Sequence, residues 1–261
     1  MIGAIIGDVV GSIYEFHNIR TKNFTLITKK NHFTDDTIMT VAIMDWLLHE
    51  KDELPVFYLQ KWGRKYPSSY GGRFAQWLME ENPQPYYSFG NGSAMRVSPI
   101  AYFAKDNKEL EELVTMSCIV SHNHPEGIKG AMVVAKCIFK ALHGASKEEI
   151  QKYAINRYPE IAEFNYQWLK RNYRFDETCQ GSVPQAIYCF LISNSFEDCM
   201  RTTISIGGDC DTTAAISGAI AGAYYGIPYK IKRRILEKLP DDMLDIICEF
   251  KKYDKHNHQK N

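Results

Sequence analysis

The sequence predicts an all-α protein folded as a single-domain helical bundle. Apolar residues recur at helical spacing along most of the 261 residues, strand-like runs are few, and no repeat or linker divides the chain. The clearest strand-like run is short and covers residues 24–27. We therefore expect one domain over residues 1–250 and a polar C-terminal tail over residues 251–261 that frays.

The composition argues against several classes of protein. The chain has 31 basic and 31 acidic residues, which disfavours a nucleic-acid binder that relies on phosphate attraction. No apolar run is long enough to span a bilayer, and the N-terminus reaches Asp8 without a basic segment, unlike a signal peptide. The seven cysteines form no C-x-x-C pair, so we expect buried thiols in a reducing compartment. Together these features predict a cytoplasmic protein that does not bind membranes. We expect a monomer, although none of these features bears on the oligomeric state.

The first predicted helix covers residues 2–16 and carries small or apolar side chains on most of its faces. Gly3, Gly7 and Gly11 recur every four residues and therefore lie on one side. In a soluble chain this spacing indicates that another helix backbone packs closely against that side.

Two acidic residues interrupt this apolar segment, Asp8 and Glu15, seven positions apart and so on nearly the same face. Asp8 fits a packing or capping role. Glu15 is expected near the end of the helix, where a negative charge opposes the helix dipole. That unfavourable position favours a functional reason for Glu15.

Helical patterns continue after a loop over residues 17–33. They cover residues 37–50, 54–66, 108–120, 126–142, 146–174, 182–193, 197–206, 212–225 and 229–250. The first of these patterns is amphipathic, and the second has Pro55 in its first turn, where proline is tolerated. Acidic residues open the 108–120 segment, the polar and aromatic 146–174 segment is expected on the surface, and a helix pair broken near Pro240 closes the domain.

Two clusters of carboxylates and hydroxyls precede predicted helices at opposite ends of the chain. One is TDDT at residues 34–37, and the other is DCDTT at residues 209–213, which leads into a run of small residues over 212–225. Small side chains let other helices approach, so we expect 212–225 to be a buried central helix. Aspartate is a common N-cap, and capping alone is one explanation of both clusters. A cap needs a single carboxylate, however, and the surplus oxygens favour a two-metal site built from both clusters.

Two further segments have open interpretations. Residues 67–93 are predicted to be a loop, ending in a glycine-rich stretch at 90–93 whose backbone N–H groups either hold an anion such as phosphate or form a tight turn. In the turn at 121–127, His122 and His124 either bind a transition metal or, as is more common, contact a substrate or cap a helix.

Four segments, in this order and at these separations, closely resemble the ADP-ribosylglycohydrolase family. They are GDVVGSIYE at 7–15, FTDDT at 33–37, GNGSAMR at 90–96 and GGDCDT at 207–212, and the resemblance spans residues 2 to about 227. The family has an all-helical orthogonal bundle with two Mg²⁺ or Mn²⁺ ions in a central cleft. The resemblance therefore implies this fold, these cofactors and a hydrolase that acts on an ADP-ribosylated protein or an ADP-ribose derivative.

The resemblance also implies roles for individual residues. It makes Glu15 and Asp35 the catalytic candidates, Glu15 matching the glutamate beside the metals and the scissile bond. His122 matches a histidine of the ADP-ribose pocket, and Cys210 replaces another small residue, a difference we expect to be tolerated. The implied metal ligands are Thr34, Asp35, Asp36, Asp209, Asp211 and Thr212. The implied loop around the diphosphate and its neighbouring ribose is Asn91, Gly92, Ser93, Ala94 and Met95.

The implied reaction is hydrolysis at C1″ of ADP-ribose, through an oxocarbenium-like state that nearby carboxylates stabilise. Arginine is the favoured linkage, because the overall pattern looks most like the bacterial activating glycohydrolases. Serine-linked, nucleobase-linked and O-acetyl-ADP-ribose are alternative substrates. Two other classes also fit the residues: a non-catalytic ADP-ribose reader and a Mg²⁺-dependent phosphohydrolase.

Overall fold

The computed structural model describes residues 1–49 and 54–258, with side chains up to residue 253. In these residues the chain forms helices and one isolated bridge between Gly90 and Thr178, so the all-α prediction is confirmed. The first half contains α1 (Ile2–Gly11), α2 (Asp35–Leu48), α3 (Pro55–Lys65), α4 (Gly72–Met79), α5 (Gly92–Met95), α6 (Ser98–Phe103), α7 (Asn107–Ile119) and α8 (Pro125–Leu142). The second half contains α9 (Lys147–Arg157), the 3₁₀ turn η1 (Pro159–Ala162), α10 (Tyr166–Asn172), α11 (Cys179–Ile192), α12 (Phe196–Ile206), α13 (Cys210–Tyr225), α14 (Tyr229–Leu236) and α15 (Asp241–His258).

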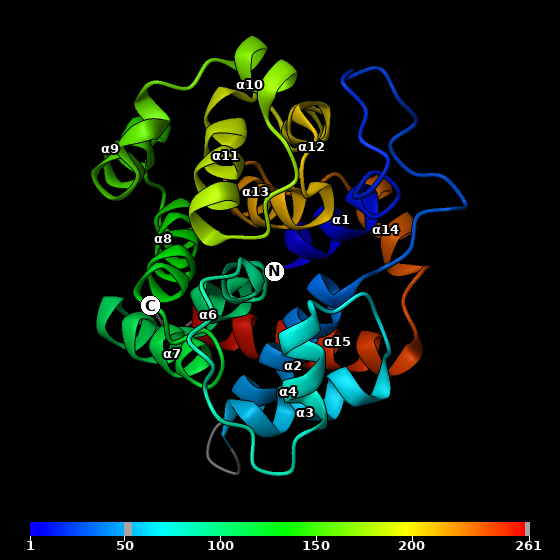
Figure 1. Cartoon of the computed structure of the whole chain (residues 1–261), viewed down its shortest axis with the longest axis vertical. Coiled ribbons are helices and arrows are strands. Elements are labelled where there is room, and N and C mark those ends of the chain that lie inside the picture. Colours follow the sequence, from blue (N-terminus) through cyan, green and yellow to red (C-terminus); the bar gives the residue numbers. More distant parts are fainter. Residues whose placement is uncertain (50–53, 259–261) are drawn as a thin grey trace.

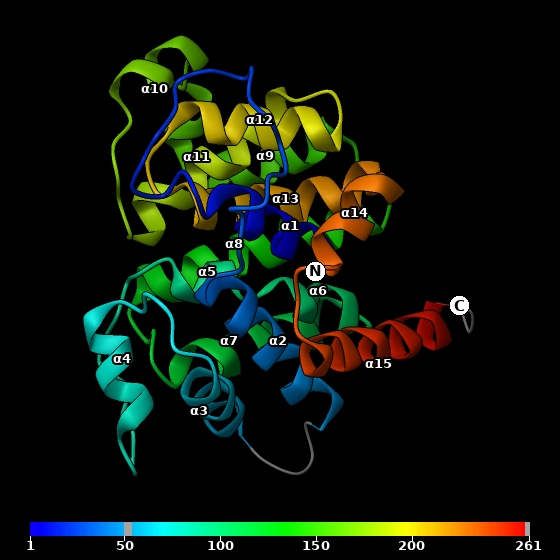
Figure 2. The same ribbon diagram turned by 90° about the vertical axis from the view of Figure 1, so that its right-hand side faces the viewer.

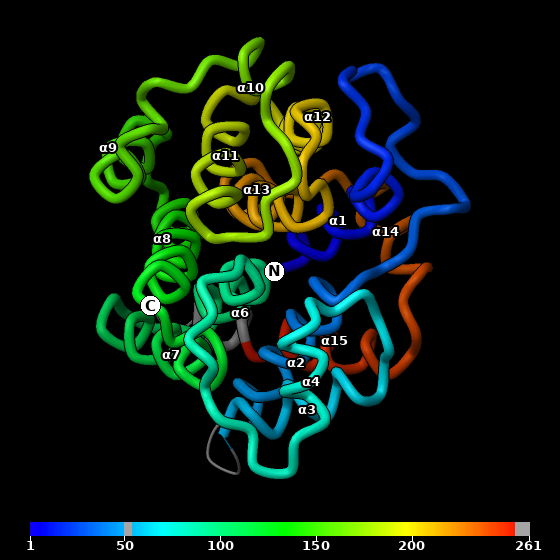
Figure 3. Tube along the Cα trace, in the orientation of Figure 1, coloured from blue at the N-terminus to red at the C-terminus, as the bar shows by residue number. Residues whose placement is uncertain are grey.

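The helices lie in two groups. α1 and α9 to α14 form the upper group in Figures 1 and 2, and α2, α3, α4, α7 and α15 form the lower group. α5, α6 and α8 lie between the two groups in these views. The long connection over residues 12–34 runs from the end of α1 in the upper group to α2 in the lower group (Figure 3). It therefore carries the first acidic cluster from one group to the other.

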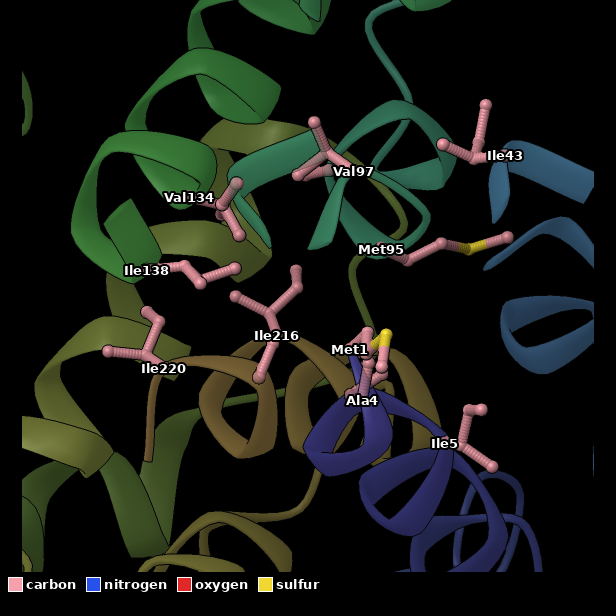
Figure 4. Close-up of a cluster of buried hydrophobic side chains, with 14 of the residues drawn as sticks. Met1, Ala4, Ile5, Ile43, Met95, Val97, Val134, Ile138, Ile216 and Ile220 are labelled. Atoms are coloured by element: carbon pink, nitrogen blue, oxygen red, sulfur yellow. The ribbon is translucent and has the colours of Figure 1, made fainter. Parts of the chain in front are cut away.

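The core is centred on α13, as predicted, and this helix is buried from Cys210 to Ala221. α13 packs against α1, α8, α11 and α12. Figure 4 shows its Ile216 and Ile220 beside Val134 and Ile138 of α8. Small side chains on α13 allow these helices to approach, and their apolar residues supply the buried area that stabilises the fold.

The three glycines of α1 face α13, which confirms the predicted close approach of a second helix. A Cβ atom on Gly7 would overlap the carbonyl of Ala214, and one on Gly11 would overlap the Cα atom of Asp211. Gly3 is likewise covered by the backbone of α13. This contact fixes the end of α1 against the start of α13, where the second acidic cluster lies.

α1 ends at Gly11, five residues earlier than predicted, although the apolar pattern continues to Tyr14. Side chains satisfy carbonyls near its end in place of another helical turn. Ser12 Oγ donates to the Val9 carbonyl at 3.0 Å, and Asn31 Nδ2 donates to the carbonyls of Val9 and Val10 at 2.9 and 3.2 Å. Glu15 therefore lies in a turn beyond the helix, and the dipole argument for it was wrong.

Other helix boundaries also differ from those predicted, because burial and capping in the folded chain outweighed the local sequence pattern. The 67–93 segment contains α4, whose Phe74, Trp77 and Leu78 are buried at helical spacing. The 146–174 segment is divided into α9, η1 and α10, since Pro159 disfavours helix in the preceding residue and Asn165 caps a new helix. No strand forms at residues 24–27, where Leu26 and Ile27 are buried without a partner strand.

α2 begins two residues earlier than predicted and is buried on nearly all faces from Asp36 to Leu47, so its expected amphipathic character was wrong. Glu50, the predicted end of this helix, lies outside the described residues. α15 continues to His258, further than expected; residues 259–261 lie outside the described part, and the polar tail stays a prediction.

All seven cysteines are free thiols, and six of them are buried as predicted. Cys248 is exposed, which corrects the expectation for that residue. None of the described helices combines the length and apolarity that a bilayer crossing requires.

Candidate active site

The first acidic cluster is held by a buried carboxylate from α1. Asp8 accepts hydrogen bonds from Thr34 N at 3.0 Å, Thr34 Oγ1 at 2.7 Å and Thr37 N at 3.0 Å. Asp8 and the N-cap Thr34 therefore satisfy the start of α2, which confirms the packing and capping role expected of Asp8. Asp35 and Asp36 are not needed as caps, and Asp36 Oδ1 is buried without a hydrogen-bond partner.

The second cluster follows a turn that only glycine adopts readily. Gly207 and Gly208 have φ angles of 68° and 82° between α12 and α13. Asp209 then occupies the N-cap position of α13, but its side chain makes no capping hydrogen bond. Instead its Oδ2 accepts from Asn91 Nδ2 at 2.7 Å. Capping alone thus explains neither cluster.

The two clusters meet. Thr212 Oγ1 donates to Asp36 Oδ2 at 3.0 Å across a sequence separation of 176 residues. One carboxylate oxygen from each of Glu15, Asp209 and Asp211 lies within 4.8 Å of the others. These residues and Asp35 line the same cleft. The predicted convergence of carboxylates from both ends of the chain is therefore present in the structure.

Glu15 reaches this cluster because Gly11 brings the end of α1 onto the backbone of Asp211. Asn18 fixes the turn that follows. Its Nδ2 donates to the Tyr14 carbonyl at 2.7 Å and to the Gly208 carbonyl at 2.9 Å, and its Oδ1 accepts from Gly208 N at 2.8 Å. One side chain thus ties the backbone next to Glu15 to the backbone next to Asp209.

The cluster concentrates negative charge in a buried place. Burial, followed by the Asp211 carboxylate, raises the pKa of Glu15 to about 8. Burial also raises the pKa of Asp209 to about 6. The pKa values of Asp35 and Asp36 lie well above their usual range, first because of burial and then because of the Asp211 charge. In the protein alone the carboxylates compete for protons, and an added positive charge would relieve this repulsion.

The donor set fits divalent cations of the Mg²⁺ or Mn²⁺ type. All donors are carboxylate or hydroxyl oxygens, which hard cations prefer. The unpartnered Asp36 Oδ1 and the mutual repulsion of the carboxylates are what a cation site requires. Asp35, Asp36, Asp209, Asp211 and Thr212 line the cleft and are available as ligands. The hydroxyl of Thr34, also a predicted ligand, is bonded to Asp8 and does not line the cleft, so its role stays a prediction.

A cleft of about 340 Å³ extends from the carboxylates to the predicted diphosphate loop. Asn91, Gly92 and Met95 of that loop line the cleft. Ser93 and Ala94 are buried behind it, and Ser93 Oγ donates to the Gly127 carbonyl at 2.8 Å. The loop is thus fixed from behind while part of its backbone faces the cleft.

His122 lies beside this loop, as predicted for a pocket residue. It is buried, its Nδ1 lies 2.8 Å from Ser121 Oγ, and a Cβ atom on Gly92 would lie 3.1 Å from its Nε2. Burial and then the charge of Arg96 hold its pKa well below the usual value, so the imidazole is neutral. His124 instead caps α8, accepting from Glu126 N at 3.0 Å, in agreement with the capping interpretation.

Several cleft residues escaped sequence reasoning because they lie in loops without periodicity. Phe175, Glu177 and Thr178 form part of the wall, just before α11. Asp176, whose Oδ1 accepts from Thr178 N at 2.9 Å, marked a turn there that could have been noticed. Tyr87, which also lines the cleft, has a φ of 57°, and no sequence signal predicts this conformation for tyrosine.

Comparisons with known proteins identify the family of the chain. The profile of the family described as ADP-ribosylglycohydrolase matches residues 1–258. The chain is 29% identical to human ADP-ribosylhydrolase ARH3, with 84% of this chain and 82% of the relative covered. It is 25% identical to the ADP-ribosyl-[dinitrogen reductase] glycohydrolase of Rhodospirillum rubrum, covering 83% and 81%.

Two further similarities extend the comparison. The ADP-ribosylarginine hydrolase Tri1 of Pseudomonas putida is 28% identical, with 84% of this chain and 67% of the relative covered. A solved structure titled ADP-ribosylglycohydrolase-related protein complex superimposes with a TM-score of 0.74 over 97% of both chains, at 22% identity, which supports the fold. By its sequence over nearly its whole length, and by its fold, the chain belongs to the ADP-ribosylglycohydrolase family.

Proposed function

We propose that the protein is a divalent-cation-dependent hydrolase that removes ADP-ribose from modified protein side chains, with arginine as the preferred linkage. The observation that carries this proposal is the convergence of Glu15, Asp209 and Asp211 with Asp35 and Asp36 in one cleft. The relatives named above as ADP-ribosyl hydrolases support the reaction class, and the Tri1 relative supports arginine.

The chain's own residues supply distinct parts of the reaction. Glu15 is half-buried at the edge of the cluster, where a carboxyl group can protonate the leaving group or accept a proton from water. Asp35 is the second candidate for this role. The remaining carboxylates stabilise positive charge that develops at C1″. Bound divalent cations would orient the ribose hydroxyls and a water molecule.

Part of the cleft lining suits the anionic part of ADP-ribose. Arg73 and Arg96 line the cleft together with Asn91 and Gly92. Arg96 is buried, its Nη2 donates to the Ser117 carbonyl at 2.8 Å, and its Nε has no partner among the described residues. A buried guanidinium that lacks a carboxylate partner in the described part of the chain favours an anion nearby, which supports a diphosphate beside Arg96.

The test is incubation with defined peptides that carry ADP-ribose on arginine or on serine, with Mg²⁺, with Mn²⁺ or with EDTA. We expect mass spectrometry to find intact ADP-ribose released from the arginine peptide with a cation and none with EDTA. Release of AMP or inorganic phosphate would instead identify a phosphohydrolase. Binding of ADP-ribose without release from any conjugate would identify a reader.

Single substitutions test the assigned roles. Glu15→Ala and Asp35→Ala are each expected to abolish turnover, because each removes a candidate proton-transfer group. Asp209→Ala and Asp211→Ala should also weaken cation binding, measured by calorimetry. Full activity of Asp211→Ala after removal of metal would contradict the proposed mechanism.

A further inference from the structure

A hollow outside the cleft is lined almost entirely by cationic side chains. Its wall consists of Arg20, Gln167, Lys170, Arg171 and Arg174, and its volume is about 480 Å³. Three of the four cations come from α10 and the segment after it, and Arg20 comes from the connection between α1 and α2. None of the described residues that line this hollow carries a carboxylate. We call it the basic hollow.

The cations of the basic hollow are not neutralised by the protein. Within the side chains of residues 1–49 and 54–253, none of the four forms an ion pair with a carboxylate. Arg174 Nη1 donates to the carbonyls of Arg171 and Tyr173 at 2.8 and 2.9 Å, and Arg20 donates to the carbonyls of Tyr173 and Ile206. Burial and then the Arg174 charge hold the pKa of Arg20 below its usual value. The repulsion within the hollow would be relieved by an anionic ligand.

The basic hollow lies next to the mouth of the cleft. Arg174 is followed directly by Phe175, which lines the cleft, and the segment from α10 descends toward the centre of the molecule in Figure 1. Phe175 stacks on the exposed Phe16 with ring centroids 6.0 Å apart, and Phe16 follows Glu15 in sequence. A macromolecule whose ADP-ribosyl group enters the cleft beside Phe175 would therefore lie close to these cations.

We propose that the basic hollow binds an acidic segment of the ADP-ribosylated target protein, with aspartate or glutamate side chains close to the modified residue. The proposal rests on the proposed function for the identity of the modification. Charge complementarity selects the ligand, and guanidinium groups bind carboxylates well.

A short acidic segment fits better than a nucleic acid. The basic hollow is confined, and acidic residues flank it: Glu160 and Glu163 stand beside Arg171 in the neighbouring hollow along α10, and Glu177 lies toward the cleft. Nucleic-acid binding depends on Lys and Arg side chains that neutralise several successive phosphates, and so needs a continuous cationic track. These acids interrupt such a track, whereas a few carboxylates on a peptide need only the hollow itself.

The experiment compares two synthetic peptides that carry the same ADP-ribosylated arginine. One has Asp and Glu flanking the modified residue, and the other has Asn and Gln at the same positions. We expect the wild-type protein to show a kcat/KM about fivefold to tenfold higher for the acidic peptide at low salt, mainly through KM, and to lose this preference at high salt.

Two triple variants locate the effect. Lys170→Ala, Arg171→Ala and Arg174→Ala together should remove the preference while leaving kcat/KM for the amide peptide unchanged. The matched control combines Lys230→Ala, Lys232→Ala and Arg233→Ala on α14, which does not line the cleft, and it should keep the wild-type preference. Equal kcat/KM for both peptides in the wild-type protein, or equal loss in both variants, would overturn the proposal.

Binding measurements separate this proposal from the proposed function. If neither peptide releases ADP-ribose, the proposed function fails, and fluorescence anisotropy with the same peptides labelled then tests the basic hollow by itself. Tighter binding of the acidic peptide, lost only in the α10 variant, supports it. Equal affinity for both peptides, or displacement of the acidic peptide by single-stranded DNA at a lower concentration than by unlabelled peptide, would overturn it.

Discussion

Asn18 illustrates how one side chain can determine the geometry of a site that it does not enter. It bonds to both sides of the junction between the turn of Glu15 and the turn of Gly208. The distance between Glu15 and Asp209 therefore depends on the hydrogen bonds of a residue outside the acidic cluster. Small displacements of catalytic groups have large effects on rate.

Asn18→Ala is expected to lower kcat about tenfold to hundredfold, because Glu15 loses its fixed position relative to Asp209. Cation affinity should fall at the same time, since the Gly208 turn holds Asp209. Kinetics and calorimetry measure the two effects. The control is Asn172→Ala, which also removes a side-chain bond to a backbone carbonyl, at 2.9 Å on the exposed face of α10. Unchanged kcat and cation affinity in Asn18→Ala would show that Asn18 has no positioning role.

His122 makes stability depend on pH. Burial and Arg96 lower its pKa in the folded protein, so the unfolded chain binds more protons below about pH 6.5. Its contribution to stability is present above that pH and is lost as the pH falls, by at most about 1.4 kcal/mol per pH unit.

His122→Gln should remove this pH-dependent contribution to stability. We expect the difference in unfolding free energy between wild type and variant to be largest above pH 7 and to shrink as the pH falls below about 6.5. Urea unfolding at a series of pH values measures it. If the unfolding free energies of the two proteins changed with pH in the same way, the assignment of a neutral, buried imidazole would be contradicted.

At the scale of single helices, the contact between α1 and α13 determines where the site residues lie. The glycine spacing of α1 brings the start of α13 within reach of Glu15, and the glycines at 207 and 208 turn the chain so that Asp209 faces the cleft. Helix packing at backbone distance thus sets the position of the carboxylates.

Gly7→Ala is expected to destabilise the protein by about 3 kcal/mol or more, because the new methyl group meets the Ala214 carbonyl in a packed helix contact. The matched control is Gly72→Ala at the start of α4, where nothing lies within 4 Å of an added Cβ atom. That change should be neutral or slightly stabilising. Thermal unfolding of both variants tests this prediction. A Tm for Gly7→Ala equal to that of the control would contradict the close approach of α1 and α13.

The sequence alone predicted those features of the site and the fold whose signal lies in neighbouring residues. The acidic clusters and the glycine stripe are readable from spacing, and the predicted convergence and close packing were both found in the structure. Asn18 and Arg20 could not be recognised, because their roles depend on backbone carbonyls of Gly208 and Ile206 that lie far away in the chain. The end of α1 was misjudged for the same reason, since Asn31 supplies the bonds that stop it.

For the whole molecule, the acidic cluster links the two groups of helices. Asp35 and Asp36 belong to α2, and Asp209 and Asp211 belong to the start of α13. Without a cation the buried like charges oppose this association, and with a cation they support it. Binding of divalent ions in the cleft should therefore stabilise the whole molecule against unfolding and not only the cleft itself.

Saturating Mg²⁺ or Mn²⁺, at about one hundred times its Kd, should raise the unfolding free energy by about 2.7 kcal/mol. Asp211→Asn should remove this increase. In EDTA the same variant should be more stable than wild type, on the order of 1 kcal/mol. It removes a carboxyl group whose ionised form is disfavoured in the folded protein, because burial and then Asp209 raise its pKa. Thermal unfolding with and without cation checks both signs, and an equal response of the two proteins to the cation would exclude Asp211 as a ligand.

The pairing of α1 with α13 also has a consequence for biosynthesis. α1 is synthesised well before α13, the helix that covers its glycines. At roughly 5–20 residues per second, the nascent chain holds α1 without its partner for about ten to forty seconds. During that interval an apolar helix is open to chaperones and proteases, and no premature termination product lacking α13 can assemble the cleft.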